Sequence, residues 1–429
     1  MNKISFSVFS FLALCILLCT ACSDDSSYKA DLSQIQRSIN ITRDSLGKEL
    51  WLEVEKNEVI KLCLDRKVRT WESSLNSKIP NDSCLTFQAP TLIGVDTINV
   101  KFFDTDSAHK INLAVGMKYL DFKNEEVLLG YKGNPSMVNP PWICRPYKEA
   151  DPERLISVTG TYLVDKRPVT QCEIVQLMWD SIPNKIQLED AFFKNGWISR
   201  KKLAQRNSIC ELQDSAASTI SVYQAMKYAN ARSIRDGLKP YYIFSAIDAQ
   251  GAVIHTKGKY DICNNDFTIQ ENEYIQVSVN YSSDGYRLLY YDEWMMFARG
   301  GDKKNKAPWG DTTATFEEVS KYAKFTYNEN DGLYDAGLVG QLEPNGYGLY
   351  DIFGLVEEHV LFEELNPFCY LKARPSCFKG GNNHITYTWK EINYGYRRPN
   401  YTNCQPGGFR LIRNIGNNAK WTEIKSDKE

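Results

Sequence analysis

Hydrophobic and polar residues alternate along the first part of the chain as they do in β-strands. The segment 50–55 (LWLEVE) alternates with a period of two, and the segment 59–64 (VIKLCL) follows after a short polar turn. The segment 97–103 (TINVKFF) alternates again and ends at the turn-forming residues 104–106 (DTD). No helical period interrupts these segments, so residues 38–114 are predicted to form a small all-β sandwich of the immunoglobulin-like type that serves as a spacer.

Two helices are predicted downstream, each from a capping box at its start. Thr170 is followed three residues later by Glu173, the spacing at which an N-cap side chain and a carboxylate satisfy each other's backbone N–H groups. Ser221 and Gln224 form a second pair of this kind. The helix that they start is expected to end at Gly237, because glycine readily adopts the left-handed C-cap conformation.

The composition fits two globular domains. The chain has 429 residues, of which 43% are hydrophobic, enough for a sizeable core. Residues 115–415 mix short strands with the two helices and are predicted to form an α+β domain, with a strand-rich insertion between Pro240 and Asn280 and a polar tail at 416–429. A net charge of −2 gives no basic footprint for nucleic acid, which leaves an unidentified protein or glycan partner.

The N-terminus has the pattern of a bacterial lipoprotein signal. An apolar run at 4–18 is too short for a transmembrane helix and ends in the segment 18–22 (LCTAC), which is similar to a lipobox. Residues 1–22 are therefore predicted to be a signal peptide, with Cys22 lipidated and anchored in a membrane. An ordinary cleaved signal peptide is the alternative.

Residues 23–37 are predicted to be a flexible acidic tether. Its opening, 23–27 (SDDSS), resembles the tether that directs some bacterial lipoproteins to the outer cell surface. The expected location is therefore the outer membrane or the cell surface, although short acidic-serine linkers are also simply flexible. Whether the protein faces the periplasm or the outside stays open.

The cysteines bear on both domains. Of twelve, three belong to the signal segment and nine remain, so at least one thiol has no partner within the chain. Cys63 and Cys84 are the two in the sandwich region and form the expected disulfide. No CxxC occurs beyond the signal and only four histidines are present, which argues against a zinc ribbon, a thioredoxin-like motif or a His-rich metal site.

Four sequence blocks, in a fixed order, resemble the formylglycine-generating enzyme (sulfatase-modifying factor) family. They are the segment 162–173 (YLVDKRPVTQCE), the helix at 222–242, the segment 285–311 with GYRLLYYDEW and ARGG, and the segment 344–413 with PNGYGLYD, KGG and GFRLIR. The resemblance identifies 115–415 as a degenerate domain of this family. It implies a C-type-lectin-like α+β fold in which four large side chains serve as core residues: Arg287, Trp294, Arg299 and Trp309.

The chemistry of the family depends on a copper-binding, redox-active cysteine pair, which this chain lacks. The pair follows a Lys-Gly-Gly turn like Lys379–Gly381, and its positions fall on Ile385 and Lys390 when counted without gaps. Neither residue supplies a thiolate, so no copper is expected and no catalytic residue is assigned. Oxidoreductase activity is the least favoured alternative, because the nearby cysteines are out of register: Cys369, Cys377 and Cys404.

The resemblance also implies a structural calcium ion. Its ligands would be the Asp351 side chain, the carbonyls of Gly354 and Val356, and Glu358. Calcium prefers several hard oxygen ligands in flexible geometry, which this set offers. A solvated acidic turn is the alternative. A second calcium site of the family is opposed by Lys324, which stands where an asparagine ligand is expected.

Two non-enzymatic functions fit these observations. The leading prediction is a non-catalytic cell-envelope lipoprotein that uses its degenerate domain as a binding or scaffold platform. The alternative is a surface protein diversified by a retroelement, because variable residues of such proteins lie between a Gly-Gly turn and a terminal GFR motif. Asparagine and tyrosine are common in that window here, which suits recognition but also fits ordinary loops. The candidate ligand surface comprises Asn383, Tyr387, Tyr394 and Tyr396.

Overall fold

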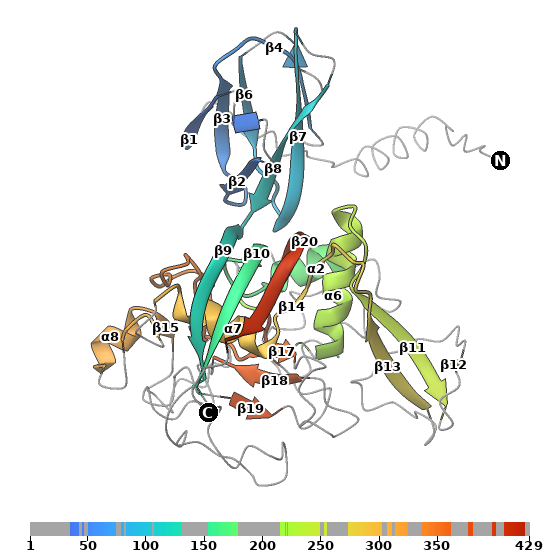
Figure 1. Cartoon of the computed structure of the whole chain (residues 1–429), viewed down its shortest axis with the longest axis vertical. Coiled ribbons are helices and arrows are strands. Elements are labelled where there is room, and N and C mark those ends of the chain that lie inside the picture. Colours follow the sequence, from blue (N-terminus) through green and yellow to red (C-terminus); the bar gives the residue numbers. More distant parts are fainter. Residues whose placement is uncertain are drawn as a thin grey trace, which may run out of the picture.

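The chain forms two regions along its long axis, an N-terminal sandwich and a larger domain beneath it (Figure 1). The structure is a computed structural model. It describes residues 35–42, 45–46, 50–73, 79–80, 83–104, 107–130, 153–178, 215–218, 220, 222–248, 253–254, 273–302, 307–310, 314–324, 337–361, 376–380, 397–399 and 407–424.

The N-terminal region is all-β, as predicted, and consists of two sheets. One sheet has the strand order β1 (Arg37–Ile41), β3 (Val59–Leu64) and β6 (Cys84–Gln88). The other has the order β2 (Leu50–Val54), β8 (His109–Val115), β7 (Gly94–Phe102), β4 (Val68–Ser73) and β5 (Ile79–Pro80). Both sheets contribute to one buried core, including Ile60, Leu62, Phe87, Trp71, Val100 and Leu113.

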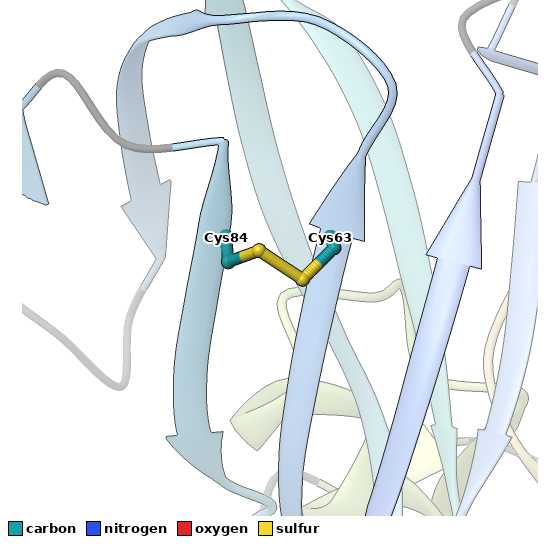
Figure 2. The surroundings of a disulfide bond; sticks show 2 residues. All are labelled: Cys63 and Cys84. Atoms are coloured by element: carbon teal, nitrogen blue, oxygen red, sulfur yellow. A yellow bond between two sulfur atoms is a disulfide. The ribbon is translucent and has the colours of Figure 1, made fainter.

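The predicted disulfide of the sandwich is confirmed. Cys63 and Cys84 stand directly opposite each other on the antiparallel strands β3 and β6, and their sulfurs are bonded (Figure 2). Cys172 in the larger domain is disulfide-bonded as well.

The larger domain is built around a four-stranded antiparallel sheet. Its order is β14 (Arg287–Leu288), β20 (Leu411–Glu423), β10 (Arg154–Asp165) and β9 (Met117–Leu129). The described helices are α2 (Gln171–Met178), α6 (Val222–Arg235), α7 (Tyr291–Arg299) and the short α8 (Phe316–Ser320). This mixture confirms the predicted α+β class.

Smaller sheets complete the domain. The predicted insertion contains β11 (Tyr242–Asp248), β12 (Val253–Ile254) and β13 (Glu273–Val279). A parallel pair joins β15 (Ala323–Lys324) to β16 (Phe353–Gly354). The sheet of β17 (Glu358–Leu361), β18 (Ser376–Lys379) and β19 (Arg397–Pro399) lies at the end of the domain that faces away from the sandwich (Figure 1).

Local sequence signals explain where the helices begin and end. In the capping box of α2, the backbone N–H of Thr170 donates to Glu173 at 2.9 Å, and the N–H of Glu173 donates to the Thr170 hydroxyl at 3.2 Å. Gly237 follows α6 with a φ of 71°, as predicted for a C-cap. Ser221, the expected N-cap of α6, lies outside the described residues.

The predicted polar tail is wrong for its first half. Residues 416–423 continue strand β20, where Lys420 to Glu423 pair with Thr159 to Ile156 of β10. The indole N–H of Trp421 donates to the Tyr162 hydroxyl at 2.9 Å. Polar side chains are compatible with this strand because only one of its faces is covered by the core, and backbone pairing with β10 holds it.

Candidate functional site

The segment that is predicted to bind calcium, Asp351 to Glu358, runs from a tight turn through β16 into β17. Three of its residues have positive φ angles: Asp351 at 53°, Gly354 at 72° and Leu355 at 54°. Residues other than glycine rarely adopt this conformation, so the surrounding structure must hold the backbone in place. Asp351 is buried, and its carboxylate accepts a 2.5 Å hydrogen bond from the backbone N–H of Gly340.

The carboxylate of Glu358 is buried and heavily hydrogen-bonded. Arg410 Nε lies 2.8 Å from Oε1 and 2.9 Å from Oε2, and Arg410 Nη2 lies 2.5 Å from Oε1. The indole N–H of Trp294 donates to Oε2 at 3.1 Å. A carboxylate has about four lone-pair sites, and these three N–H groups occupy most of its accepting capacity.

Arg410 joins this segment to the entry of the domain. Its Nη2 donates to the carbonyl oxygen of Tyr350 at 2.9 Å, and its Nη1 lies 3.4 Å from the carbonyl oxygens of Asp165 and Lys166. A planar guanidinium with five N–H donors is suited to such a node, where a point-like ammonium is not. The arginine of the GFR motif therefore ties three distant parts of the chain together.

Burial raises the pKa of both carboxyl groups in this segment. Desolvation raises the pKa of Asp351, while the hydrogen bond from Gly340 and the charge of Arg410 act in the opposite direction. Desolvation also raises the pKa of Glu358, and the nearby Asp351 adds to this effect while Arg410 opposes it. Arg410 is hydrogen-bonded to Glu358, and its charge acts on Asp351 together with the charges of Arg167 and Lys324.

The segment meets the requirements of calcium only in part. Its carboxylates and carbonyls are suitable oxygen donors. Ligation by Glu358, however, requires a hydrogen bond from Arg410 or Trp294 to give way. Lys324 in β15 adds positive charge that acts on Asp351. Calcium binding therefore stays a prediction.

The described residues were also compared with two other kinds of site, a metal site built from side chains and a membrane-spanning helix. Within those ranges, no three His, Cys, Asp or Glu side chains gather where they could hold a metal ion. No helix among the described residues is long and apolar enough to cross a membrane.

The Lys-Gly-Gly turn packs directly against this segment. The carbonyl oxygen of Gly380 accepts a 2.8 Å hydrogen bond from the N–H of Gly354. Gly380 has a φ of 89°, and a Cβ there would stand 2.7 Å from a backbone oxygen, so only glycine fits. The buried ammonium of Lys379 lies 4.9 Å from the ring centre of Tyr291 and 5.0 Å from that of Trp294. Lys379 and Gly380, which precede the candidate ligand residues in sequence, are therefore held in place.

The four residues that were predicted to serve the core do so. Trp294 and Arg299 are buried in the described structure. Arg287 makes a bidentate ion pair with Glu293, with N···O distances of 2.6 and 2.7 Å. Trp309 is partly buried and packs against the main core cluster.

A sequence match decides the family. Residues 121–415, more than half of the chain, match the sulfatase-modifying factor enzyme 1-like domain. The chain belongs to this family. The matched range lies within the predicted domain at 115–415, and β20 extends beyond its end to Glu423.

One curated relative matches part of this sulfatase-modifying factor protein. The chaperone protein LppX of Paenibacillus barcinonensis is 30% identical over 150 residues, which cover 32% of this chain and 49% of that protein. The chain thus spans about half the length of the curated relative that it matches.

Three solved structures are similar to this chain at low identity. Treponema denticola variable protein 1 is 19% identical with a TM-score of 0.45, over 75% of this chain and 99% of its own. CarF is 19% identical with a TM-score of 0.40, over 70% and 98%. PvdO from Pseudomonas aeruginosa is 16% identical with a TM-score of 0.40, over 73% and 97%.

Several predicted functional positions lie outside the described residues. These are the positions of the family's cysteine pair, the candidate ligand surface, the lipidation site and two nearby cysteines: Ile385, Lys390, Asn383, Tyr387, Tyr394, Tyr396, Cys22, Cys369 and Cys404. Cys377 lies in β18, whose backbone is described. The roles predicted for these residues stay predictions.

The role of His359 was not predicted from the sequence. This residue is buried in β17, with Nε2 2.7 Å from the carbonyl oxygen of Ile220 and its ring centre 4.5 Å from that of Phe378. It stands where the resemblance places the last tryptophan of a GNVWEW motif, read here as GLVEEH at 354–359. The departure from that motif was visible, but only the structure shows that a packed aromatic ring is kept.

Proposed function

We propose that this protein is a non-catalytic member of the sulfatase-modifying factor family that works as a binding or scaffold platform on the cell envelope. The observation that carries the proposal is the presence of Ile385 and Lys390 at the positions of the family's cysteine pair. An aliphatic side chain and an ammonium group offer no soft sulfur ligand for copper(I). Gly380, before these positions in sequence, and Arg410, after them, are held by packed hydrogen bonds, which supports a role in which the scaffold itself is used.

The name of one relative agrees with a role other than oxidation. LppX is called a chaperone protein. The match covers only part of both proteins, so it supports the class of function and identifies no client. We infer a protein or glycan partner, bound through the candidate surface of Asn383, Tyr387, Tyr394 and Tyr396.

The proposed location is the outer membrane or the cell surface, with the lipid on Cys22. The sandwich is the described region nearest in sequence to that anchor, and β18 and β19, which flank the candidate ligand surface, lie at the far end of the molecule (Figure 1). This separation between the sandwich and the strands β18 and β19 supports a platform whose family domain faces away from the membrane. Replacing Cys22 by Ala should move the protein from the membrane fraction to the soluble fraction, and a variant that keeps its lipid label would overturn the anchor.

A structural calcium ion at Asp351 and Glu358 is also proposed. The support is the pair of buried carboxylates beside a turn whose carbonyls belong to Gly354 and Val356. The ion would stiffen the base of the platform and take no part in chemistry.

The test of the non-catalytic proposal is a peptide assay. The purified protein is incubated with copper, oxygen and a cysteine-containing sulfatase peptide, and the peptide mass is followed. The mass should stay unchanged, whereas a bona fide formylglycine-generating enzyme, as positive control, should convert the cysteine to an aldehyde. Conversion of the peptide by this protein would contradict the proposal. Ala substitutions at Cys369, Cys377 and Cys404 would then locate the catalytic thiol.

The matched variant restores what is missing. Ile385→Cys together with Lys390→Cys places two thiols at the positions of the pair, and copper(I) binding to this variant but not to the parent would show that the register is right. Equal copper binding by both proteins would show that the parent binds the metal elsewhere, and it would contradict the proposal that the parent has no copper site.

A further inference from the structure

The residue that joins the two regions is held from both sides. Gly116 alone separates β8 from β9, and its φ is 63°. Its N–H donates to the carbonyl oxygen of Val54 at 2.7 Å, and its own carbonyl oxygen accepts from the N–H of Lys166 at 3.1 Å. A Cβ at Gly116 would stand 2.9 Å from the Ile93 side chain, which leaves no room for another residue. The joint is therefore a packed connection and not a free hinge.

Acidic residues at the end of β2 meet basic residues of the domain's entry. Glu53 lies 3.1 Å from the Lys118 ammonium and accepts from the backbone N–H of Tyr119 at 3.2 Å. Glu55 pairs with Lys166 and with Arg167, each at 2.8 Å. Exposed ion pairs stabilise little one at a time, but several that share partners form a network that fixes orientation.

A second contact lies at the end of helix α6. Arg235 Nη2 donates to the carbonyl oxygen of Ile93 at 2.6 Å, and the N–H of Val95 donates to the carboxylate of Asp236 at 3.1 Å. The hydroxyl of Tyr286 donates to the same carboxylate at 2.7 Å. The sandwich is thus held at two separate places, which together oppose rotation about Gly116.

Apolar packing crosses the joint as well. Ile93 and Ala114 of the sandwich are buried in the same cluster as Met117, Ile174 and Tyr228 of the larger domain. The default expectation for two domains in one chain is relative motion unless their interface is apolar and well packed. A shared buried cluster meets that condition, so the two regions should unfold together.

The entry residues that hold the sandwich also hold the candidate site. Lys166 and Arg167 bind Glu55 through their side chains, while the carbonyl oxygen of Lys166 accepts from the N–H of Tyr350 at 2.8 Å. The same carbonyl oxygen lies 3.4 Å from Nη1 of Arg410. Tyr350, the residue before Asp351, is therefore hydrogen-bonded to the backbone of Lys166, whose side chain is held by Glu55 of the sandwich.

We propose that the sandwich is a rigid bracket for the larger domain, not an independent spacer, and that it orders the Asp351–Glu358 segment through Lys166 and Arg167. This inference goes beyond the proposed binding function and holds whether or not that function is right. Removing the clamp should loosen the entry segment and the 350–358 segment together, although they lie far from Glu53 and Glu55 in sequence.

Hydrogen exchange of the full chain in detergent tests this proposal. The variant Glu53→Lys with Glu55→Lys reverses the clamp, and amide exchange at 116–119, 166–170 and 350–358 should speed up by about tenfold. The matched control is Glu72→Lys in the same sandwich, which breaks the 3.7 Å pair with Lys101 away from the joint and should leave those amides unchanged. Unchanged exchange in the double variant would overturn the bracket.

A charge swap covers the case in which the double variant fails to fold. Glu55→Arg combined with Arg167→Glu restores an opposite-charge pair across the joint, and exchange at 166–170 and 350–358 should return towards that of the parent. Loss of protection equal to that of Glu55→Arg alone would count against the clamp. Calorimetry of the parent gives an independent answer, because a bracket predicts one cooperative transition and a free spacer predicts two.

Discussion

Ion pairs inside the family domain and ion pairs at its joint with the sandwich have the same chemistry but different surroundings. The side chains of Arg410 and Glu358 are 0% and 1% exposed, and both side chains of the Arg232–Asp165 pair are 0% exposed. At the joint, the side chain of Glu55 is 44% exposed. Inside the domain, each charge depends on its partner, whereas at the joint water can replace a lost partner.

The difference shows which contacts specify the fold and which adjust it. The Arg232 guanidinium lies 2.9 Å from both oxygens of Asp165 and 4.2 Å from the Tyr286 ring centre, and Asp165 also accepts from the N–H of Leu411. Such a node admits one arrangement of α6, β10 and β20. The joint distributes its charges over several partners, so no single pair there is indispensable.

The largest effect is expected from breaking a buried pair. Arg410→Met leaves the Glu358 carboxylate buried without its cation, which should lower the free energy of unfolding by about 3–5 kcal/mol in urea titrations. Arg410→Met combined with Glu358→Leu removes both charges and should recover part of that loss. A loss below about 1 kcal/mol for the single variant would show that the pair is not what holds the segment.

The disulfide of the sandwich tests whether the two regions unfold as one. Replacing Cys63 and Cys84 by Ala together should cost about 3 kcal/mol, because the bond closes a loop with a sequence separation of 21 residues. If the sandwich is a rigid bracket, the whole calorimetric transition shifts to lower temperature. A shift confined to one of two transitions would separate the sandwich from the family domain.

Bound calcium should stabilise the Asp351–Glu358 segment further. An ion that binds only the folded state at 100 times its Kd adds about 2.7 kcal/mol, so a chelator should lower the Tm of the parent. Asp351→Gly removes a proposed ligand while tolerating the φ of 53°, and its Tm should not respond to the chelator. Magnesium is the control ion, and identical melting of the parent with calcium and with chelator would rule the site out.

Much of the fold was predictable because its signals are local. The alternation at 50–55 and 97–103 anticipates β2 and β7, and the Thr170–Glu173 capping box anticipates the start of α2. The four family blocks fix the order of the elements in the larger domain. These signals need no knowledge of what packs against them.

The pairings inside the site were not predictable, because they join residues far apart in sequence. Glu358 and Arg410 are 52 positions apart, and either could have faced solvent on the evidence of residue type alone. Strand β20 was cut short for a related reason, since its polar end is specified by pairing with β10 and not by its own hydrophobicity. The binding role of Asn383 and the tyrosines near it stays a prediction from composition.

The smallest effect is expected at the joint, where pH gives the direction. Partial burial raises the pKa of Glu55, but the hydrogen bond and charge of Lys166, with the charges of Arg167 and Arg37, outweigh it and hold that pKa below 4.5, its ordinary value. A lowered pKa means that Glu55 contributes stability above the pKa of the unfolded chain and loses it as the pH falls through the folded value. Glu55→Gln should therefore cost at most about 1 kcal/mol at neutral pH, and less at high salt. The gap between parent and variant in urea titrations should close on acidification, and a gap that widens there would reverse the assigned sign.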